Sequence, residues 1–413
     1  MARTLWGKVY FKDTYAGRLQ EEPGGRCVFT YDPTYLSSEQ PAAIAHTLPL
    51  RAGPHISERG LHPFFDNLVA EGWFRNAQAR ALGIDPGNRF ALLLGFGHDL
   101  AGAVSVEDPE PAARMDIDHA DEATIAALLG RASLSGVQRK LLVLKEGRSY
   151  RPVGPNELST HIAKLPSGNL TDLLELEYLT TLAVRTLLPG EEIVDMDIVH
   201  LQSIKENALI IPRFDRTGSG KRLIHFEEFN QLLGKYSGDD KYDGAYEDLG
   251  QFILRTPSCI PVEADRLLRR ILTCLLVGNT DAHFKNFAMF HTRDGLRLAP
   301  AYDLVAASFY PEYQSIALSI AGARNMAIGL LQAKHLVRMA EGFGVNEDAL
   351  VSAVEQLGKR LPTALAALEG SDVGPKPLRE RLKERMEKRW NGSFASTGPL
   401  LSKKRSKGGK AKS

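Results

Sequence analysis

The sequence predicts an α+β fold, with short strands in the first half of the chain and helices in the second. Up to about residue 214, runs rich in β-branched and aromatic residues recur between turn residues, as at 5–11 and 26–31. From about residue 225 onward, helical spacing of leucine and isoleucine dominates, most clearly at 264–277, where Gly278 follows in the position of a helix C-cap. With 413 residues, the chain is long enough for about two to three domains.

The first part of the chain, residues 1–108, is expected to fold as a small mixed α/β domain. Its helical stretch is predicted at 64–82, where Phe65, Leu68 and Trp73 share one face. Its strands are predicted at 5–11, 17–19, 26–31, 90–94 and 102–106. Residues 107–121, which are rich in proline, aspartate and alanine, predict the boundary that follows.

The middle part, residues 122–224, is predicted to form a sheet with one long helix between its strands. The elements expected are a helix at 122–129, a hairpin of 140–144 with 149–152, a strand at 160–165, a helix at Leu173–Leu187, and strands at 195–200 and 208–214. Strands ahead of one long helix, with more strands after it, are typical of the small lobe of a protein kinase.

The last part, residues 225–395, is predicted to be a mainly helical large lobe. Its expected elements are helices at 264–277, 334–341, 348–357 and 377–390 and a hairpin of 287–290 with 296–298. The chain as a whole is therefore expected to have a two-lobed, protein-kinase-like fold behind its N-terminal domain. Residues 396–413 are expected to be a disordered basic tail, because six of the last eleven residues are Lys or Arg and none is acidic.

Charge and cysteine usage argue against a strongly basic protein, a cysteine metal site and a disulfide-stabilised fold. The formal net charge is +1, so apart from the tail the chain has no strongly basic character. Cys27, Cys259 and Cys274 are too widely spaced for a metal motif and too few for a disulfide framework. No run of about 18 apolar residues predicts a membrane span, and the first residues lack the apolar core of a signal peptide. A cytoplasmic location is expected.

The most informative segment is 278–286, which reads Gly-Asn-Thr-Asp-Ala-His-Phe-Lys-Asn. Kinase catalytic loops supply an Asp for the attacking hydroxyl, an Asn five positions later, and a second Asp beyond a short hairpin. Asp281, Asn286 and Asp303 keep this pattern. Asp281 alone would fit a turn residue that bonds backbone amides, but the joint spacing favours a catalytic carboxylate.

The same loop offers ligands for Mg²⁺ and groups for phosphate. Asn286 has an amide oxygen and Asp303 a carboxylate. The hairpin between them is expected to bring both side chains to the same end of the hairpin. Considered singly, each also fits a turn. His283 could position the loop or a phosphate, or pack in the core. Lys285 could neutralise charge on the transferred phosphoryl group, or be solvated.

A nucleotide also needs a loop over its phosphates and a basic group against them. The segment 133–140, Ser-Leu-Ser-Gly-Val-Gln-Arg-Lys, could be that loop, although its single glycine matches neither a Walker A motif nor the multi-glycine kinase loop. Lys164 ends a strand pattern and resembles the strand lysine that contacts phosphates, with Glu177 on the next helix as a plausible ion-pair partner. The alternative for Lys164 is a solvent-facing lysine.

Together these motifs resemble the HipA-like serine/threonine kinases, the toxin halves of bacterial toxin–antitoxin pairs. The resemblance covers the chain to about residue 390. It rests on 63–68, 71–72 and 102–104 in the N-terminal part and on 135–140, 161–166, 213–216, 278–286 and 302–303 in the kinase part.

The resemblance implies a role for each matching residue. Asp281 would be the catalytic aspartate, and Asn286 and Asp303 would hold Mg²⁺. Ser133 stands where relatives carry an autophosphorylated serine that switches the kinase off, and a phosphate there would add up to about two negative charges beside ATP. Lys164 would contact the phosphates, and 212–214 would form the adenine-side hinge. The residues implied to contact ATP are Ser135, Gly136, Val137, Gln138, Arg139, Lys140, Lys164, Pro212, Arg213, Phe214, His283, Phe284, Lys285, Asn286, Tyr302 and Asp303.

The resemblance also implies a function and partners. The chain is expected to be an ATP- and Mg²⁺-dependent kinase toxin that phosphorylates a protein, and the substrate class that the resemblance implies is an aminoacyl-tRNA synthetase. Its partner would be a small helix-turn-helix antitoxin (HipB-like) that binds operator DNA. Two alternatives stay open: a small-molecule phosphotransferase, and a catalytically silent co-repressor acting with a DNA-binding antitoxin. The N-terminal domain and the Ser133 loop argue against the first, and the intact Asp281, Asn286 and Asp303 argue against the second.

Overall fold

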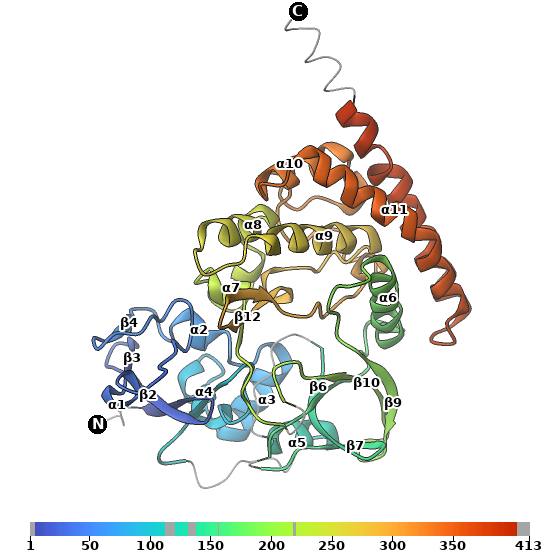
Figure 1. Cartoon of the computed structure of the whole chain (residues 1–413). Helices are drawn as coiled ribbons and strands as arrows, with labels where there is room; N and C mark the ends of the chain where they lie inside the picture. The colour runs from blue at the N-terminus through green and yellow to red at the C-terminus, as the bar shows by residue number, and fades with distance from the viewer. Residues whose placement is uncertain (1–4, 112–119, 131–137, 156, 218–219, 403–413) are drawn as a thin grey trace, which may run out of the picture. The chain divides into compact units, whose positions relative to one another are not determined.

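The computed structural model describes residues 5–111, 120–130, 138–155, 157–217 and 220–402 (Figure 1). The chain divides into two compact units, and each is described by itself. The first unit comprises residues 1–169 and 195–241, and the second comprises residues 170–194 and 242–413. Both units are therefore built from two separate segments of the chain.

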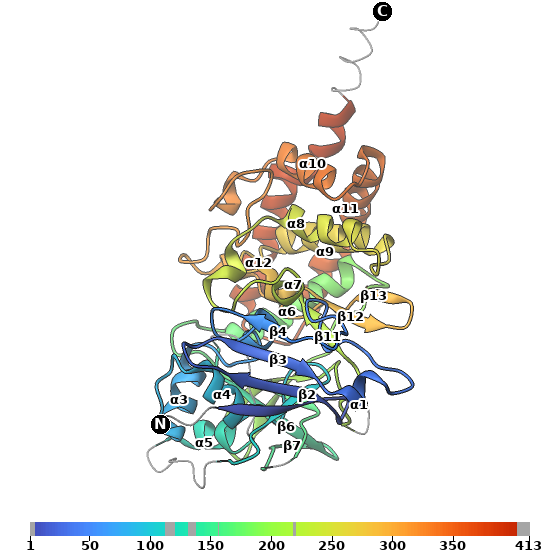
Figure 2. The ribbon, with the colours of Figure 1, turned by 90° about the vertical axis from the view of Figure 1, so that its left-hand side faces the viewer.

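The N-terminal sheet of the first unit has five antiparallel strands among the described residues. In order across the sheet they are β4 (His55–Ser57), β3 (Cys27–Tyr31), β2 (Thr14–Glu21), β1 (Trp6–Phe11) and β5 (Val104–Glu107), and Figure 2 shows β2, β3 and β4 side by side. Burial alternates along β1, so Val9 and Phe11 enter the core. The strands predicted at 5–11, 17–19, 26–31 and 102–106 are confirmed as β1, β2, β3 and β5.

The helix predicted at 64–82 is interrupted. α2 (Pro63–Asp66) ends at Asn67, whose side-chain amide donates to the Pro63 carbonyl at 2.8 Å. α3 (Gly72–Leu82) begins at Gly72, which has a φ of +56°. A right-handed helix does not continue through a left-handed residue, so two helices form where the sequence predicted one.

The strand predicted at 90–94 is wrong, because these residues lie in α4 (Arg89–Phe96). The Asn88 side chain accepts a hydrogen bond from the Ala91 amide at 3.0 Å and so caps the helix. The run from Phe90 to Phe96 is buried on nearly every side. Such a run carries no apolar–polar period that separates a buried helix from a buried strand.

The second sheet of the first unit matches the predicted strands closely. Its described strands, in order, are β7 (Ser149–Pro152), β6 (Lys140–Glu146), β8 (His161–Lys164), β10 (Glu206–Pro212) and β9 (Asp197–Leu201). The antiparallel register of β6 with β8 sets Lys140 opposite Lys164. Further described elements of this unit are α1 (Pro33–Leu36), α5 (Glu122–Leu129), β11 (Phe226–Glu228) and α7 (Phe229–Leu232). α5 confirms the helix predicted at 122–129.

A buried network of two arginines and two aspartates lies in the first unit. Arg213 donates to Asp99 at 3.0 Å and to Asp215 at 2.7 Å, and Arg216 donates to the same two carboxylates at 2.6 and 2.8 Å. Burial alone would raise the pKa of Asp99, but the charges of Arg213 and Arg216 outweigh it and hold that pKa well below its usual range. The network joins residues of the N-terminal domain to the end of β10.

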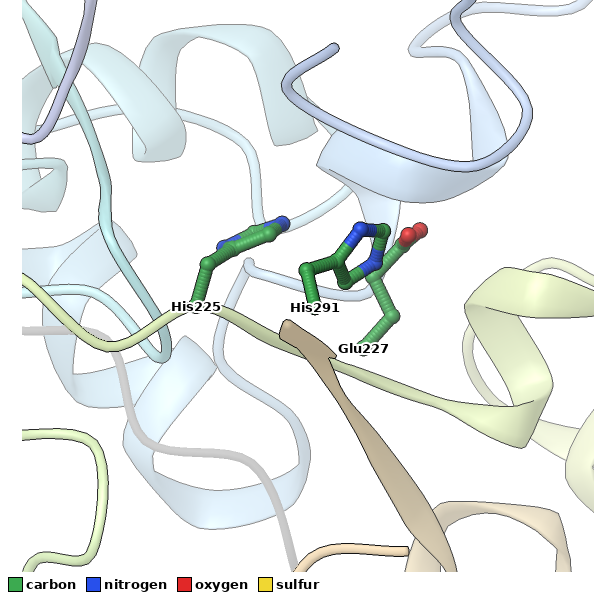
Figure 3. Close-up of side chains that lie close together, drawn as sticks. All are labelled: His225, Glu227 and His291. Atoms are coloured by element: carbon green, nitrogen blue, oxygen red, sulfur yellow. The ribbon is translucent and has the colours of Figure 1, made fainter. Parts of the chain in front are cut away.

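Two further buried side chains tie the segment after residue 224 to the N-terminal domain. His225 and Glu227 lie two positions apart, and Figure 3 shows their side chains on the same side of the chain. The His225 ring accepts a hydrogen bond from the Ala103 amide at 3.3 Å, and the Glu227 carboxylate accepts one from the His46 amide at 2.6 Å. The third residue labelled in Figure 3, His291, belongs to the second unit.

The second unit is built around α9 (Val262–Val277), which packs against α6, α8, α11 and α12. Leu267, Leu268, Ile271 and Leu275 of α9 are fully buried, as helical spacing predicted. The other described helices are α6 (Leu173–Leu187), α8 (Tyr246–Arg255), α10 (Ala333–Gly342), α11 (Glu347–Gly370) and α12 (Lys376–Arg389), with the short turns η3 (Ala307–Phe309), η4 (Ile328–Leu330) and η5 (Trp390–Phe394).

α6, α9, α10 and α12 confirm predicted helices, but α8 was not predicted and α11 is longer than predicted. α11 was expected to end at 357, since Gly358 and Pro362 usually interrupt a helix. In the folded chain a Cβ on Gly358 would lie 2.5 Å from the Trp390 ring, so this glycine makes room for an aromatic side chain.

The end of the chain continues the helical part further than the sequence suggested. Residues 397–402, expected to belong to the basic tail, are helical, with Thr397 and Leu401 buried. Residues 403–413 lie outside the described residues. In the part of the chain that the structure describes, no helix combines the length and the apolar character needed to cross a membrane.

Candidate catalytic site

The loop with the predicted catalytic residues begins where α9 ends. Gly278 is the helix C-cap, with a φ of +88° and its amide bonded to the Cys274 carbonyl at 3.0 Å. A Cβ at this position would lie 2.4 Å from the Ser308 hydroxyl oxygen and 2.7 Å from the Arg389 guanidinium carbon. Both the backbone conformation and the close packing therefore require glycine, and the loop leaves the helix in one defined direction.

Asp281 lies in this loop and is only partly buried. Its Oδ1 atom accepts a hydrogen bond from the Tyr242 hydroxyl at 3.0 Å. The Tyr242 ring in turn meets the His283 ring edge-on, with centroids 5.0 Å apart. The carboxylate is thus accessible and is held by a side chain far from it in sequence.

Residues 283–286 form a compact turn that fixes Asn286. The His283 amide donates to the Asn286 side-chain oxygen at 3.0 Å, and the Asn286 amide donates back to the His283 carbonyl at 2.9 Å. Phe284, in the 3₁₀ turn η2 (Phe284–Asn286), is fully buried, and a Cβ on Gly244 would lie 2.5 Å from its ring. His283 thus positions the loop through its backbone.

The structure brings Asn286 and Asp303 together, as their spacing predicted. The Asn286 side-chain amide donates to the Asp303 carboxylate at 2.9 Å. Asp303 has a φ of +56°, a conformation that costs a non-glycine residue on the order of 1–3 kcal/mol and is common at functional sites. The Asn286 nitrogen thus faces Asp303, while the Asn286 oxygen accepts the hydrogen bond from the His283 amide. The two side chains are neighbours, and the carboxylate and amide oxygens that they carry are of the ligand type that Mg²⁺ prefers.

The hairpin between these two residues is also as predicted. β12 (Ala288–Thr292) and β13 (Gly295–Leu298) pair antiparallel, and the Tyr302 hydroxyl then donates to the Lys285 carbonyl at 2.7 Å. The Lys285 side chain is buried, with 5% of its surface exposed, so it is not the solvated lysine of the alternative interpretation.

Cys274 behaves as the buried small residue that its apolar surroundings predict. It lies in the last turn of α9 before the loop and is almost completely buried. Burial raises the pKa of its thiol to about 12, so the thiol stays protonated. It is therefore a packing residue and not a nucleophile.

Several residues of the first unit were predicted to contact the nucleotide, and the structure describes only some of them. Ser133, Ser135, Gly136 and Val137 lie outside the described residues. The Gln138 side chain donates to the Leu165 carbonyl at 2.9 Å. Arg139 forms ion pairs with Asp121 at 3.3 Å and Glu206 at 3.7 Å.

Lys164 is a buried lysine at the end of β8. Only 4% of its surface is exposed, which does not fit the alternative of a solvent-facing lysine. Glu177, its suggested ion-pair partner, is a fully buried residue of α6 in the second unit, and their pairing stays a prediction.

The three residues predicted at the adenine-side hinge lie at the end of β10 and directly after it. Pro212 ends that strand, and the Arg213 amide donates to the Thr160 carbonyl at 2.9 Å. The Arg213 guanidinium belongs to the buried network with Asp99 and Asp215 and is not available to a ligand. The Phe214 ring packs edge-on against Phe226, with centroids 4.9 Å apart.

The sequence did not reveal Tyr242, whose hydroxyl contacts Asp281. It lies far upstream of Asp281, in the turn η1 (Asp239–Tyr242), with no motif around it. Tyr246 was missed in the same way; its hydroxyl donates to the Ala282 carbonyl at 3.0 Å, and burial raises its pKa well above the usual value. Only the path of the chain through the second unit brings these tyrosines to the loop.

Comparisons with known families agree with the geometry. Residues 132–365 match the family model of the HipA-like C-terminal domain, and residues 7–107 match that of the HipA N-terminal domain. The chain is 30% identical over 338 residues to "Putative kinase Y4mE" of Sinorhizobium fredii, which covers 74% of this chain and 78% of the relative. It is 28% identical over 399 residues to the serine/threonine-protein kinase toxin HipA of Shewanella oneidensis, and this alignment covers 88% of this chain and 89% of that protein.

A solved structure shares the fold. The chain resembles a chain in the complex of the Shewanella oneidensis toxin–antitoxin system HipA, HipB and its operator DNA, with a TM-score of 0.75 and 22% identity over 95% of this chain and 99% of that one. The predicted fold class, α+β and kinase-like with a mixed N-terminal domain, is confirmed by this similarity.

Proposed function

The chain belongs to the HipA-like family, and we propose that it is an ATP- and Mg²⁺-dependent serine/threonine protein kinase that acts as the toxin of a toxin–antitoxin pair. The observation that carries the proposal is the loop of the second unit, in which Asn286 is bonded to Asp303 and Asp281 remains accessible. These are the three groups that phosphoryl transfer from a nucleotide needs.

In this proposal Asp281 acts on the acceptor hydroxyl. Its carboxylate orients the hydroxyl and takes its proton as the hydroxyl oxygen bonds to the γ-phosphorus of ATP. The bond from that phosphorus to the β–γ bridging oxygen breaks, and ADP leaves with the electron pair. Asn286 and Asp303 would hold Mg²⁺, which neutralises charge on the phosphates when it is bound.

The other predicted residues have supporting roles in the proposal. Lys285, which is a buried residue of the loop, would stabilise negative charge on the transferred group, and Tyr302 would hold the Lys285 backbone. Lys164 would contact the phosphates of ATP. The backbone of residues 212–214 would contact the adenine. The Arg213 side chain would not, because its guanidinium is bonded to the carboxylates of Asp99 and Asp215. Gln138, Arg139 and Lys140 would lie along the nucleotide, with His283 and Phe284 shaping the loop.

The proposal includes partners and a switch. The antitoxin would be a small helix-turn-helix protein that binds operator DNA. A partner that binds operator DNA is supported by the Shewanella oneidensis complex, which contains HipA, HipB and operator DNA. Ser133 would be the site of self-limiting autophosphorylation, and the substrate would be a protein of the cytoplasm, such as an aminoacyl-tRNA synthetase.

The experiment that tests this function offers ATP, Mg²⁺ and a choice of acceptors to the purified chain. One set of acceptors is a panel of aminoacyl-tRNA synthetases, and the other is a panel of aminoglycosides and similar small molecules. We expect labelled phosphate to appear on one synthetase and on Ser133, mapped by mass spectrometry. Label on a small molecule alone would favour the phosphotransferase, and label nowhere would favour the silent co-repressor.

A further inference from the structure

Tyr242 makes direct contact with the proposed catalytic carboxylate. Its hydroxyl donates to Asp281 Oδ1 at 3.0 Å while its ring rests against the His283 ring. With 41% of its surface exposed, Tyr242 lies at the edge of the site and not in the core. A hydrogen bond to a charged acceptor is among the stronger hydrogen bonds in proteins, so Tyr242 can restrict the rotation of the Asp281 carboxylate. A carboxylate that rotates freely spends less time in the reactive orientation.

The preceding residue, Lys241, is fixed in a different place. Its ammonium group forms an ion pair with Glu71 at 3.1 Å, and both side chains are more than nine-tenths buried. The Ser237 hydroxyl donates to the other Glu71 oxygen at 3.1 Å. Glu71 precedes α3 in the N-terminal domain, so this pair anchors the segment before Tyr242 within the first unit.

The chain passes from the first unit to the second between these two residues. Lys241 is the last residue of the first unit, and Tyr242 is the first of the returning segment of the second. Both belong to one 3₁₀ turn, η1, and consecutive Cα atoms lie only about 3.8 Å apart. A displacement of Lys241 must therefore move the Tyr242 backbone as well.

We propose that Tyr242 is a positioning residue for Asp281 and that the ion pair of Lys241 with Glu71 of the N-terminal domain governs it. This inference rests on the proposed kinase function. It assigns the N-terminal domain a part in setting the rate of phosphoryl transfer: with the pair formed, Tyr242 holds Asp281 toward the acceptor, and with the pair broken, that orientation is lost.

The first test replaces the hydroxyl alone. Tyr242→Phe in the full-length protein is expected to lower the maximal rate of self-phosphorylation from γ-labelled ATP about tenfold, with the half-saturating ATP concentration unchanged. Tyr313→Phe is the matched control, because Tyr313 belongs to the same unit and is 42% exposed; it should keep the wild-type rate. A rate equal to or above wild type in Tyr242→Phe overturns the positioning role, since a phenol that merely blocks Asp281 would release activity.

The second test asks whether the ion pair acts through Tyr242. Glu71→Gln/Lys241→Met replaces both partners, so that no unpaired buried charge remains. It should lower the maximal rate to a similar extent, and adding Tyr242→Phe should lower it no further. Effects that multiply, or a wild-type rate in the neutral pair, overturn the coupling. Thermal unfolding of each variant shows which of them are folded, and Glu71→Gln/Lys241→Gln, a second neutral pair, replaces the first if that variant does not fold.

The variants distinguish a failure of the kinase function from a failure of the control by the N-terminal domain. If Asp281→Asn retains the wild-type rate, the kinase function itself is wrong. If Asp281→Asn is inactive while Tyr242→Phe and the neutral pair retain full rate, the kinase function stands and the control by the N-terminal domain is wrong.

Discussion

Gly278 is the residue at which α9 ends and the catalytic loop begins, and its surroundings leave no room for a side chain. Gly278→Ala would place a Cβ 2.4 Å from the Ser308 hydroxyl oxygen in a residue whose φ is +88°. A left-handed conformation costs roughly 1–2 kcal/mol for an L-residue, and overpacking typically adds about 1–3 kcal/mol. We expect the free energy of unfolding to fall by about 2–4 kcal/mol, measured by urea denaturation.

The control for this substitution is another glycine of the second unit. A Cβ on Gly329 would meet nothing within 4 Å, and its φ is not positive. Gly329→Ala should therefore leave the urea midpoint close to wild type. Equal midpoints for the two variants would show that the end of α9 relaxes without cost.

At the scale of elements, α4 shows what a local pattern leaves undecided. Its apolar run was predicted to be a strand, and the deciding feature is the Asn88 cap at its start. We expect Asn88→Ala to lower the free energy of unfolding by about 1 kcal/mol, because the Ala91 amide loses its acceptor. Asn88→Asp keeps an acceptor and should remain close to wild type in the same urea titration. If the alanine variant is as stable as the aspartate variant, the cap does not hold α4.

Other elements could be predicted because their signals are local. The helix Leu173–Leu187 has the predicted bounds, and the hairpin of β12 and β13 follows from its turn residues. Asn286 and Asp303 could be paired from spacing alone, since a hairpin brings its two ends together. α11 was cut short because Gly358 is a breaker in sequence but a packing residue beneath Trp390 in the structure.

At the scale of the whole molecule, the long-range contacts could not be predicted. Nothing in the sequence links Asp99 with Arg213, or Tyr242 with Asp281. Nor does it show that each unit is built from two segments of the chain. These features depend on the path of the backbone, which sequence periodicity does not encode.

The buried network of the first unit predicts a response to acid. Burial alone would raise the pKa values of Asp99 and Asp215, but the charges of Arg213 and Arg216 hold both below their usual range. Such carboxylates add stability above the unfolded-state pKa of about 3.9, and that contribution disappears as the pH falls toward the folded-state value. We expect the unfolding free energy of the first unit to fall once the pH drops below about 4.

This response can be measured by tryptophan fluorescence during urea unfolding between pH 7 and pH 3. Trp390→Phe removes the tryptophan of the second unit and leaves Trp6 and Trp73 to report on the first. In that background, the neutral pair Asp99→Asn/Arg216→Met should show a weaker loss of stability in acid. The same loss with and without the pair would mean that other carboxylates cause it.

In the proposed function, Asp281 acts in phosphoryl transfer from ATP. The most direct measurement is the rate of label transfer from γ-labelled ATP, in the presence of Mg²⁺, by the full-length protein and two variants. Asp281→Asn should lower the rate at least about 100-fold with an unchanged unfolding midpoint. Asp294→Asn, at the exposed turn of the β12–β13 hairpin, should keep the wild-type rate. A wild-type rate in folded Asp281→Asn would show that Asp281 takes no part in the transfer.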